Sequence, residues 1–144
     1  MKNRRSLCLL KTFAFLLGVA ISFHGCSDDG PKRYKVSGTV TANGQIVDQG
    51  TISLEPVGGG ASSGGVVIDG KFECESIPGE MIVVVTGSRL IPGAPKVEVL
   101  PGEFVDARED IVAPKYHSSS SDLRVTVEAS NDESANVFEI KADK

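Results

Sequence analysis

Four carboxylates stand close together in one stretch of the sequence, at Glu103, Asp106, Glu109 and Asp110. Carboxylate oxygens are the ligands that Ca²⁺ prefers in proteins. The spacing of these residues does not match the loop of an EF-hand, and a solvated charged loop explains the same pattern. The loop from Glu103 to Asp110 is therefore a candidate cation site within an alternative interpretation, and the main interpretation does not depend on it.

A second polar stretch contains the residue types of nucleophilic catalysis. His117, serines at positions 118–121 and Asp122 are consecutive in the chain. A catalytic triad needs a nucleophile, a base and an orienting acid that converge in space, and consecutive residues of a loop do not converge. His117 is also the only histidine after residue 25, so it has no histidine partner. The stretch predicts a solvated polar loop, and we expect no enzymatic activity.

Two further kinds of site have only weak support. Lys35 and Asn136 have the residue types of the isopeptide bonds found in some surface-pilin sandwiches. Lys35 is out of phase with Val36 on a predicted strand, however, so its side chain should face solvent. Glycan-binding surfaces usually depend on exposed Trp or Tyr, whereas this sequence has no Trp and only Tyr34 and Tyr116.

The clearest chemical signal is Cys26, because of the residues that precede it. Residues 1–11 include four basic residues and no acidic one, and residues 12–23 form an apolar run of 12 residues. A membrane-spanning helix needs about 20 residues, so this run fits the apolar part of a signal peptide. Gly25 directly before Cys26 resembles the lipobox of bacterial lipoproteins. An ordinary signal peptide cut near Gly25, with Cys26 incidental, is the alternative.

The lipobox resemblance implies three segments. Residues 1–25 would be a lipoprotein signal peptide, residues 26–33 the lipidated N-terminus and a polar tether, and residues 34–142 the folded domain. Acyl chains such as palmitate on Cys26 would anchor the protein in the lipid bilayer, since several chains on one terminus bind stably. We therefore expect an exported protein, anchored to a bacterial membrane and facing the periplasm or the cell surface.

The net charge of the predicted mature part, residues 26–144, indicates which classes of partner are disfavoured. The whole chain has a net charge of −4, but 11 basic and 19 acidic residues follow residue 25, which gives −8. Such an acidic domain argues against binding to nucleic acid, where a basic face supplies the affinity. If Cys26 is acylated, Cys74 is the only remaining cysteine, so neither an internal disulfide nor a Cys/His zinc site is expected.

Polarity alternates with period two in the rest of the chain, which is typical of half-buried strands. The alternating segments are residues 34–41, 51–56, 123–128 and 136–140. Residues 81–86 form a continuous apolar run that predicts a central strand. We therefore predict an all-β fold, a single antiparallel β-sandwich of about seven strands.

The connections between these strands show clear turn signals. Asn43-Gly44 and Asp69-Gly70 predict tight hairpin turns, because Asn, Asp and Gly tolerate positive φ. Residues 58–65 predict a flexible loop. Residues 87–112 contain three prolines and are expected to be irregular, with one short strand at residues 96–100.

The order of these strand and turn motifs resembles a known family. The motifs are Val36-Ser37-Gly38-Thr39-Val40, Asn43-Gly44, residues 50–54, residues 68–72, Pro78-Gly79 before a valine-rich strand, and Pro114-Lys115-Tyr116. They resemble the carboxypeptidase regulatory-like domain, which has a transthyretin-like (prealbumin-type) sandwich fold and occurs alone in short bacterial lipoproteins. The resemblance covers about residues 34–141. It implies a fold and no catalysis, because the motifs are mainly turn chemistry.

Together these observations favour a non-enzymatic, membrane-anchored lipoprotein with a structural or interaction role in the cell envelope. Its expected partners are the lipid bilayer, through acylated Cys26, and an envelope protein or glycan. The alternative is a module that binds a small ligand, a glycan or Ca²⁺, with the loop from Glu103 to Asp110 as the cation site.

Overall fold

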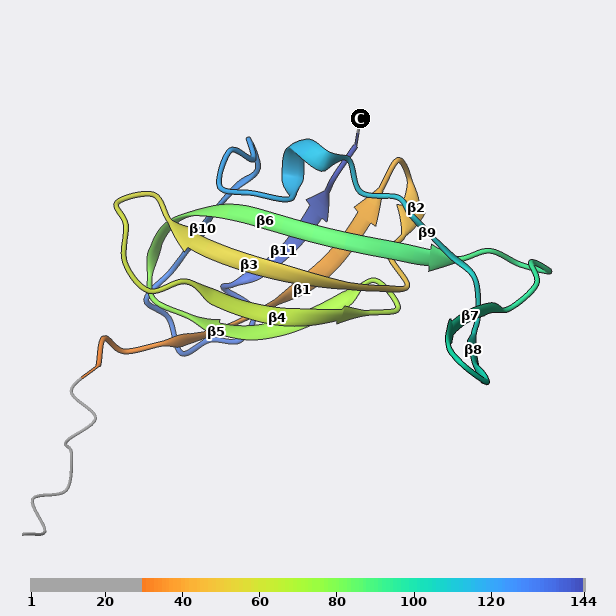
Figure 1. Ribbon diagram of the computed structural model, residues 1–144. Helices are drawn as coiled ribbons and strands as arrows, with labels where there is room; N and C mark the ends of the chain where they lie inside the picture. The colour runs from red at the N-terminus through yellow and green to blue at the C-terminus, as the bar shows by residue number, and fades with distance from the viewer. Residues whose placement is uncertain (1–29, 144) are drawn as a thin grey trace, which may run out of the picture. The chain divides into compact units, whose positions relative to one another are not determined.

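The computed structural model describes residues 30–143, and the chain from Pro31 onward forms one compact unit. Nearly all of its regular structure is β-strand, so the all-β prediction is confirmed (Figure 1). The strands are β1 (Tyr34–Ala42), β2 (Gln45–Ile46), β3 (Gln49–Pro56), β4 (Ser63–Ile68), β5 (Lys71–Ser76), β6 (Gly79–Leu90), β7 (Val97–Leu100), β8 (Glu103–Val105), β9 (Arg108–Asp110), β10 (Arg124–Val127) and β11 (Val137–Lys141). One short 3-10 helix, η1 (Pro114–Tyr116), precedes β10.

Seven of these strands form one continuous hydrogen-bonded path, in the order β10-β6-β3-β4-β5-β1-β11. Strand β2 adds to β1, and β9 adds to β6. Neighbours in the path are antiparallel, apart from β1 and β11, which are parallel with Ser37 opposite Val137. The apolar run predicted as a central strand is part of β6, which has neighbours on both sides.

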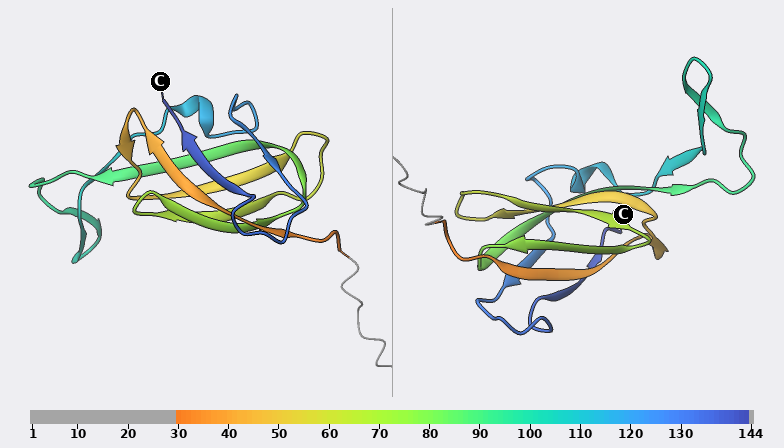
Figure 2. Two further views of the ribbon diagram at one scale, coloured as in Figure 1. Left: turned by 180° about the vertical axis from the view of Figure 1, so that it is seen from behind. Right: turned by 90° about the horizontal axis from the view of Figure 1, so that it is seen from below.

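The path curls so that its two halves enclose one core (Figure 2). Strand β4 pairs with β3 over six residues but with β5 only at Val67 and Ile68, so the sheet turns at this hairpin. The buried Asn136 connects the two ends of the path. Its side-chain amide donates to the carbonyl oxygen of Glu128 (3.1 Å) and accepts from the Glu128 N–H (2.7 Å).

The core consists of the inward-facing residues of the alternating strands. On β1 these are Val36, Val40 and Ala42, all fully buried, and β6 contributes another three. The β6 residues are Met81, Val83 and Val85, and Val47 and Ala142 of the core also have no exposed surface. Cys74 is buried beside this core as a free thiol, and loss of solvation raises its pKa. A buried thiol with a raised pKa behaves as a small hydrophobic side chain.

The two predicted tight turns are confirmed. Asn43 and Gly44 have φ of 52° and 73°, and Asp69 and Gly70 have φ of 49° and 71°. Two consecutive positive φ angles match the twist of the strands that the turn joins. These residue pairs therefore set the register of the β1–β2 and β4–β5 hairpins.

The prediction of irregular structure over residues 87–112 is wrong in part. Strand β6 continues to Leu90, where it pairs with β9, and the segment between them contains the β7–β8 hairpin. The predicted strand at residues 96–100 corresponds to β7. The predicted loop at residues 58–65 is shorter than expected because β4 begins at Ser63, where the backbone pairs with Leu54.

Candidate functional site

The β7–β8 hairpin stands apart from the curled sheet in every view (Figures 1 and 2). It is a separate two-stranded sheet, reached through the end of β6 and the start of β9. Its base is held by the Leu90–Arg108 strand pair, by the Ile91 N–H donating to Ala107 O (2.9 Å), and by an Arg89–Glu109 ion pair (2.6 Å). The hairpin is therefore fixed to the domain at its base and surrounded by solvent beyond it.

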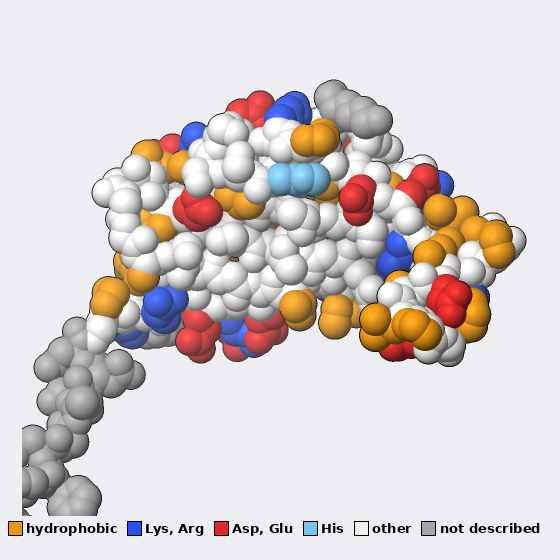
Figure 3. Space-filling view, in the orientation of Figure 1, with side chains coloured by type: hydrophobic (Ala, Val, Ile, Leu, Met, Phe, Trp, Pro, Cys, Tyr) orange, Lys and Arg blue, Asp and Glu red, His pale blue; other side chains and the backbone are white. Residues whose placement is uncertain are grey.

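The hairpin exposes large apolar side chains on both of its faces. Val97 lies opposite Val105, and Phe104 lies opposite Glu98, so these two pairs point to opposite faces. The exposed apolar residues of the hairpin and its connections are Leu90, Ile91, Val97, Val99, Leu100, Phe104 and Val105. Their side chains form the hydrophobic cluster over β7–β8 in Figure 3. Contiguous exposed apolar surface of this kind marks interaction sites on soluble domains.

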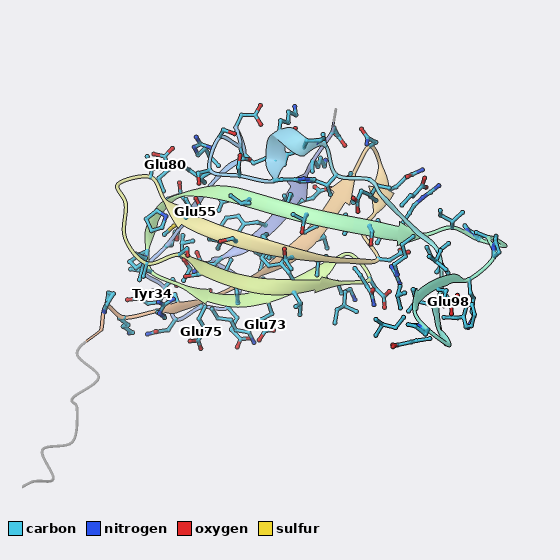
Figure 4. All side chains as sticks on the ribbon, viewed as in Figure 1. Tyr34, Glu55, Glu73, Glu75, Glu80 and Glu98 are labelled. Atoms are coloured by element: carbon cyan, nitrogen blue, oxygen red, sulfur yellow. The ribbon has the colours of Figure 1, made fainter. Side chains whose placement is uncertain are left out.

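The polar groups of the hairpin are mostly acidic. Lys96 pairs with Asp106 (3.7 Å), and Glu98 accepts a hydrogen bond from the Gly102 N–H (2.8 Å), which fixes the turn (Figure 4). Neither Glu98 nor Glu103 has a cationic partner among residues 30–143. The hairpin therefore presents two carboxylates without a cationic partner beside its apolar surface.

A second exposed apolar surface lies on the outer face of β4, β5, β1 and β11. It forms a shallow groove of about 570 Å³. Val66, Ile68 and Val137 line it, and each is more than half exposed. Ser37 and Thr39 of β1 lie between them in the strand register, so the groove has an apolar surface with hydroxyl groups at its centre.

Two charged residues line this groove, Lys71 and Glu73 of β5. Glu73 points away from the sheet (Figure 4) and pairs with Lys35 (3.3 Å), which also pairs with Glu133 (3.4 Å). Hydrogen bonds to Glu73 and Glu133 raise the pKa of Lys35. Lys71 has no carboxylate partner in the described part of the chain, so it is the charged residue of the lining without an ion pair.

The carboxylates of the candidate cation loop, from Glu103 to Asp110, do not form one cluster in the structure. Asp106 pairs with Lys96, Glu109 pairs with Arg89, and Glu103 lies on the hairpin. No group of three or more potential metal-ligating side chains occurs among the described residues. The four carboxylates proposed for Ca²⁺ therefore have separate surroundings.

The polar stretch around His117 does not form a catalytic arrangement either. The ring Nε2 of His117 is 3.2 Å from the carbonyl oxygen of Val112. The hydroxyl groups of Ser118 and Ser120 bond to each other (2.7 Å), and the buried Ser121 accepts from the Leu123 N–H (3.2 Å). These hydrogen bonds shape the loop between η1 and β10.

The residues considered for an isopeptide bond and for sugar binding make contacts within the domain. The Lys35 side chain is exposed, as its phase predicts, and is held by two carboxylates, whereas the Asn136 amide is occupied by the Glu128 backbone. Tyr116 is buried and donates to the carbonyl oxygen of Asp143 (2.7 Å), and Tyr34 is half-buried. A lysine ammonium lies over one face of each ring, Lys32 over Tyr34 (5.1 Å to the centroid) and Lys115 over Tyr116 (4.5 Å).

The predicted signal peptide at residues 1–25 and the predicted lipid attachment at Cys26 lie outside the described residues. Within the described residues, no helix is long and apolar enough to cross a membrane. Comparisons with family models, with curated proteins and with solved structures found no match to this chain.

Sequence reasoning missed the hairpin as a candidate site. The signal was present, because Leu100-Pro101-Gly102-Glu103 places a Pro-Gly turn between two short apolar stretches. Three prolines within the same region led to the expectation of irregular structure instead. The sequence does not reveal that both faces of the hairpin are exposed, because a strand buried in the core would contain the same apolar residue types.

Proposed function

We propose that this chain is a bacterial lipoprotein of the carboxypeptidase regulatory-like type, exported by residues 1–25 and anchored by acyl chains on Cys26. Its β-sandwich has no catalytic role and contacts another component of the cell envelope. The observation that supports this function is the β7–β8 hairpin, which stands off the core and exposes apolar side chains on both faces.

Exposed apolar area costs free energy, at roughly 25 cal/mol for each Å² that a partner would remove from water. The hairpin has seven large exposed apolar residues in or beside it, of the 12 that the described residues contain. A surface that a partner covers accounts for this arrangement better than a contribution to folding does.

The predicted tether limits where that partner lies. Residues 26–33 are eight residues, and even a fully extended chain of that length spans only about 28 Å. An anchor on Cys26 would thus hold the domain close to the bilayer surface. The partner would then be in the envelope, at the same membrane or directly beside it.

Detergent-phase partitioning of the full chain, expressed with its own N-terminus, tests the anchor. We expect the wild type and a Cys8→Ser control to enter the detergent phase and the Cys26→Ser variant to remain in the aqueous phase. The control replaces the other cysteine of the N-terminal region and leaves the proposed attachment site intact. Aqueous partitioning of the wild type, or detergent partitioning of Cys26→Ser, would contradict the proposal.

A further inference from the structure

We propose that the partner of the β7–β8 hairpin is a second copy of this chain, and that the hairpin docks in the outer-face groove of that copy. This inference rests on the proposed function in one respect, because it names the partner of the interaction module. Such docking requires that the hairpin and the groove have complementary apolar surfaces and complementary charges, and that each has a strand edge free to pair.

The apolar surfaces of the two sites are complementary in form. The hairpin is a projection, with Phe104 and Leu100 exposed by 55% and 61%. The groove is a hollow of about 570 Å³, lined by Val66, Ile68 and Val137. These two sites contain most of the exposed large hydrophobic residues that the structure describes. One contact between copies would cover both.

The charges that lack an ion-pair partner are opposite at the two sites, while Glu73 in the groove is paired with Lys35. The hairpin has two carboxylates without a cationic partner, Glu98 and Glu103, whereas the groove has one ammonium without a carboxylate, Lys71. Docking would place Lys71 of one copy near the carboxylates of the other. Complementary charges of this kind set register and exclude wrong partners.

The same charges disfavour the other occupants. Residues 96–106 contain one basic and three acidic residues, so two hairpins packed against each other would bring like charges together. Insertion into an anionic lipid surface would meet the same repulsion. The groove of a second copy offers apolar surface and a positive charge at once.

Unpaired strand edges supply the third element of the fit. Strand β11, which contributes Val137 to the groove, pairs only with β1 among the described strands. The β7–β8 hairpin pairs with no strand outside itself in the same part of the chain. A hairpin that covers Val137 would reach this edge of the groove, where one of its strands can pair with β11 and satisfy backbone groups.

A hairpin-to-groove contact joins copies head to tail. After one such contact, each pair still has one free hairpin and one free groove, so the same contact either repeats reciprocally in a two-fold pair or continues into a ring or a row. Anchors on Cys26 would keep the copies at one membrane, and the resulting high effective concentration favours a contact that is weak in solution.

Cross-linking between two differently tagged full-length copies in one cell tests the contact. One copy has Phe104→Cys and the other has Val137→Cys, and a short bismaleimide joins thiols that lie close together. We expect a cross-link between the two tags at least five times stronger than that between Phe104→Cys and a Val57→Cys control. Val57 is 50% exposed, which is close to the 57% of Val137, but it lies outside the groove.

Three results would overturn the proposal. One is a signal no stronger than the Val57→Cys control. Another is a Phe104→Cys cross-link to itself that equals the mixed pair, which indicates hairpin-to-hairpin contact. The third is a cross-link only within a single copy that contains both substitutions, which places the hairpin on its own groove. Detergent-phase partitioning tests the anchor, and cross-linking tests the hairpin contact. The two proposals can therefore fail separately.

Charge exchange provides a second test that leaves the core untouched, because Lys71 and Glu103 are both exposed. Lys71→Glu on the groove copy should lower the cross-link about three- to tenfold, since exposed ion pairs have small energies. Glu103→Lys on the hairpin copy should restore it. Equal cross-linking in all four combinations would show that these charges do not meet, and would contradict the proposed register.

Discussion

At the scale of single residues, Asn136 is the polar side chain on which the closure of the sheet depends. It is fully buried, and both ends of its amide bond to the backbone of Glu128, just after β10, while Asn136 itself directly precedes β11. This amide takes the place of a strand pair that the two edges do not form. Asn136 therefore stabilises the fold, and is not the cross-linking partner that its residue type suggested.

Replacing Asn136 with Ala should lower the free energy of unfolding by about 2 kcal/mol, because the Glu128 N–H and carbonyl lose their buried partner. Denaturant unfolding of the full chain measures this change. Asn131→Ala is the matched control, since Asn131 is exposed in the neighbouring loop and should change stability by less than about 0.5 kcal/mol. Equal stability of the two variants would refute the role assigned to Asn136.

Gly38 shows how closely the strands of the sheet approach one another. A Cβ at this position would overlap the carbonyl oxygen of Phe138 and would come within 2.9 Å of Phe72 Cε1. Gly38→Ala should therefore cost about 2 kcal/mol or more, because β1 and β11 would have to separate. Gly58→Ala, where a Cβ meets nothing within 4 Å, should leave stability unchanged or slightly higher. Thermal unfolding of the two variants compares them, and a tolerated Gly38→Ala would argue against this packing.

At the scale of elements, the hairpin and the curled sheet have different roles. Leu54 of β3 is 1% exposed in the core, whereas Leu100 of β7 is 61% exposed. Leu54→Ala should lower the free energy of unfolding by about 2 to 5 kcal/mol, and Leu100→Ala should change it by less than about 0.5 kcal/mol. Urea titration of both variants makes the comparison. A large loss with Leu100→Ala would mean that the hairpin stabilises the fold and is not a free docking element.

The sequence predicted most elements of the core because local signals and tertiary structure agree there. Asn43-Gly44 and Asp69-Gly70 have the φ angles that their turns require, and the run at residues 81–86 lies in an interior strand. Strands β8 and β9 were missed because each has only three residues, too few to show alternation. Strand β9 forms because it pairs with the end of β6. The residues of β9 themselves do not show this pairing, because it depends on a strand elsewhere in the sequence.

The candidate site was less predictable than the fold. The sequence places Val66, Ile68 and Val137 on different strands, and only the register of β4, β5, β1 and β11 brings them to one groove. The pairing of Glu73 with Lys35, which leaves Lys71 unpaired, also depends on that register. The order of strands in a sheet is difficult to predict from a single sequence. Surfaces that several strands form together can therefore be identified only in the folded domain.

At the scale of the whole molecule, the proposed N-terminal anchor precedes a domain that presents an exposed hairpin. The proposed anchor would account for the basic start, the apolar run and the Gly25-Cys26 junction, and the domain contains the acidic remainder. Neither part alone explains why an acidic β-sandwich would expose apolar surface. If the proposed anchor holds the module at a membrane, its partners would be concentrated there in two dimensions.

The most direct test of this account is the intact mass of the protein expressed with its own N-terminus. The account predicts a mature chain that begins at Cys26 and exceeds the mass of residues 26–144 by the acyl groups on that residue. In the Cys26→Ser variant the added mass should be absent. A wild-type chain that starts elsewhere, or that has an unmodified Cys26, would contradict the central claim.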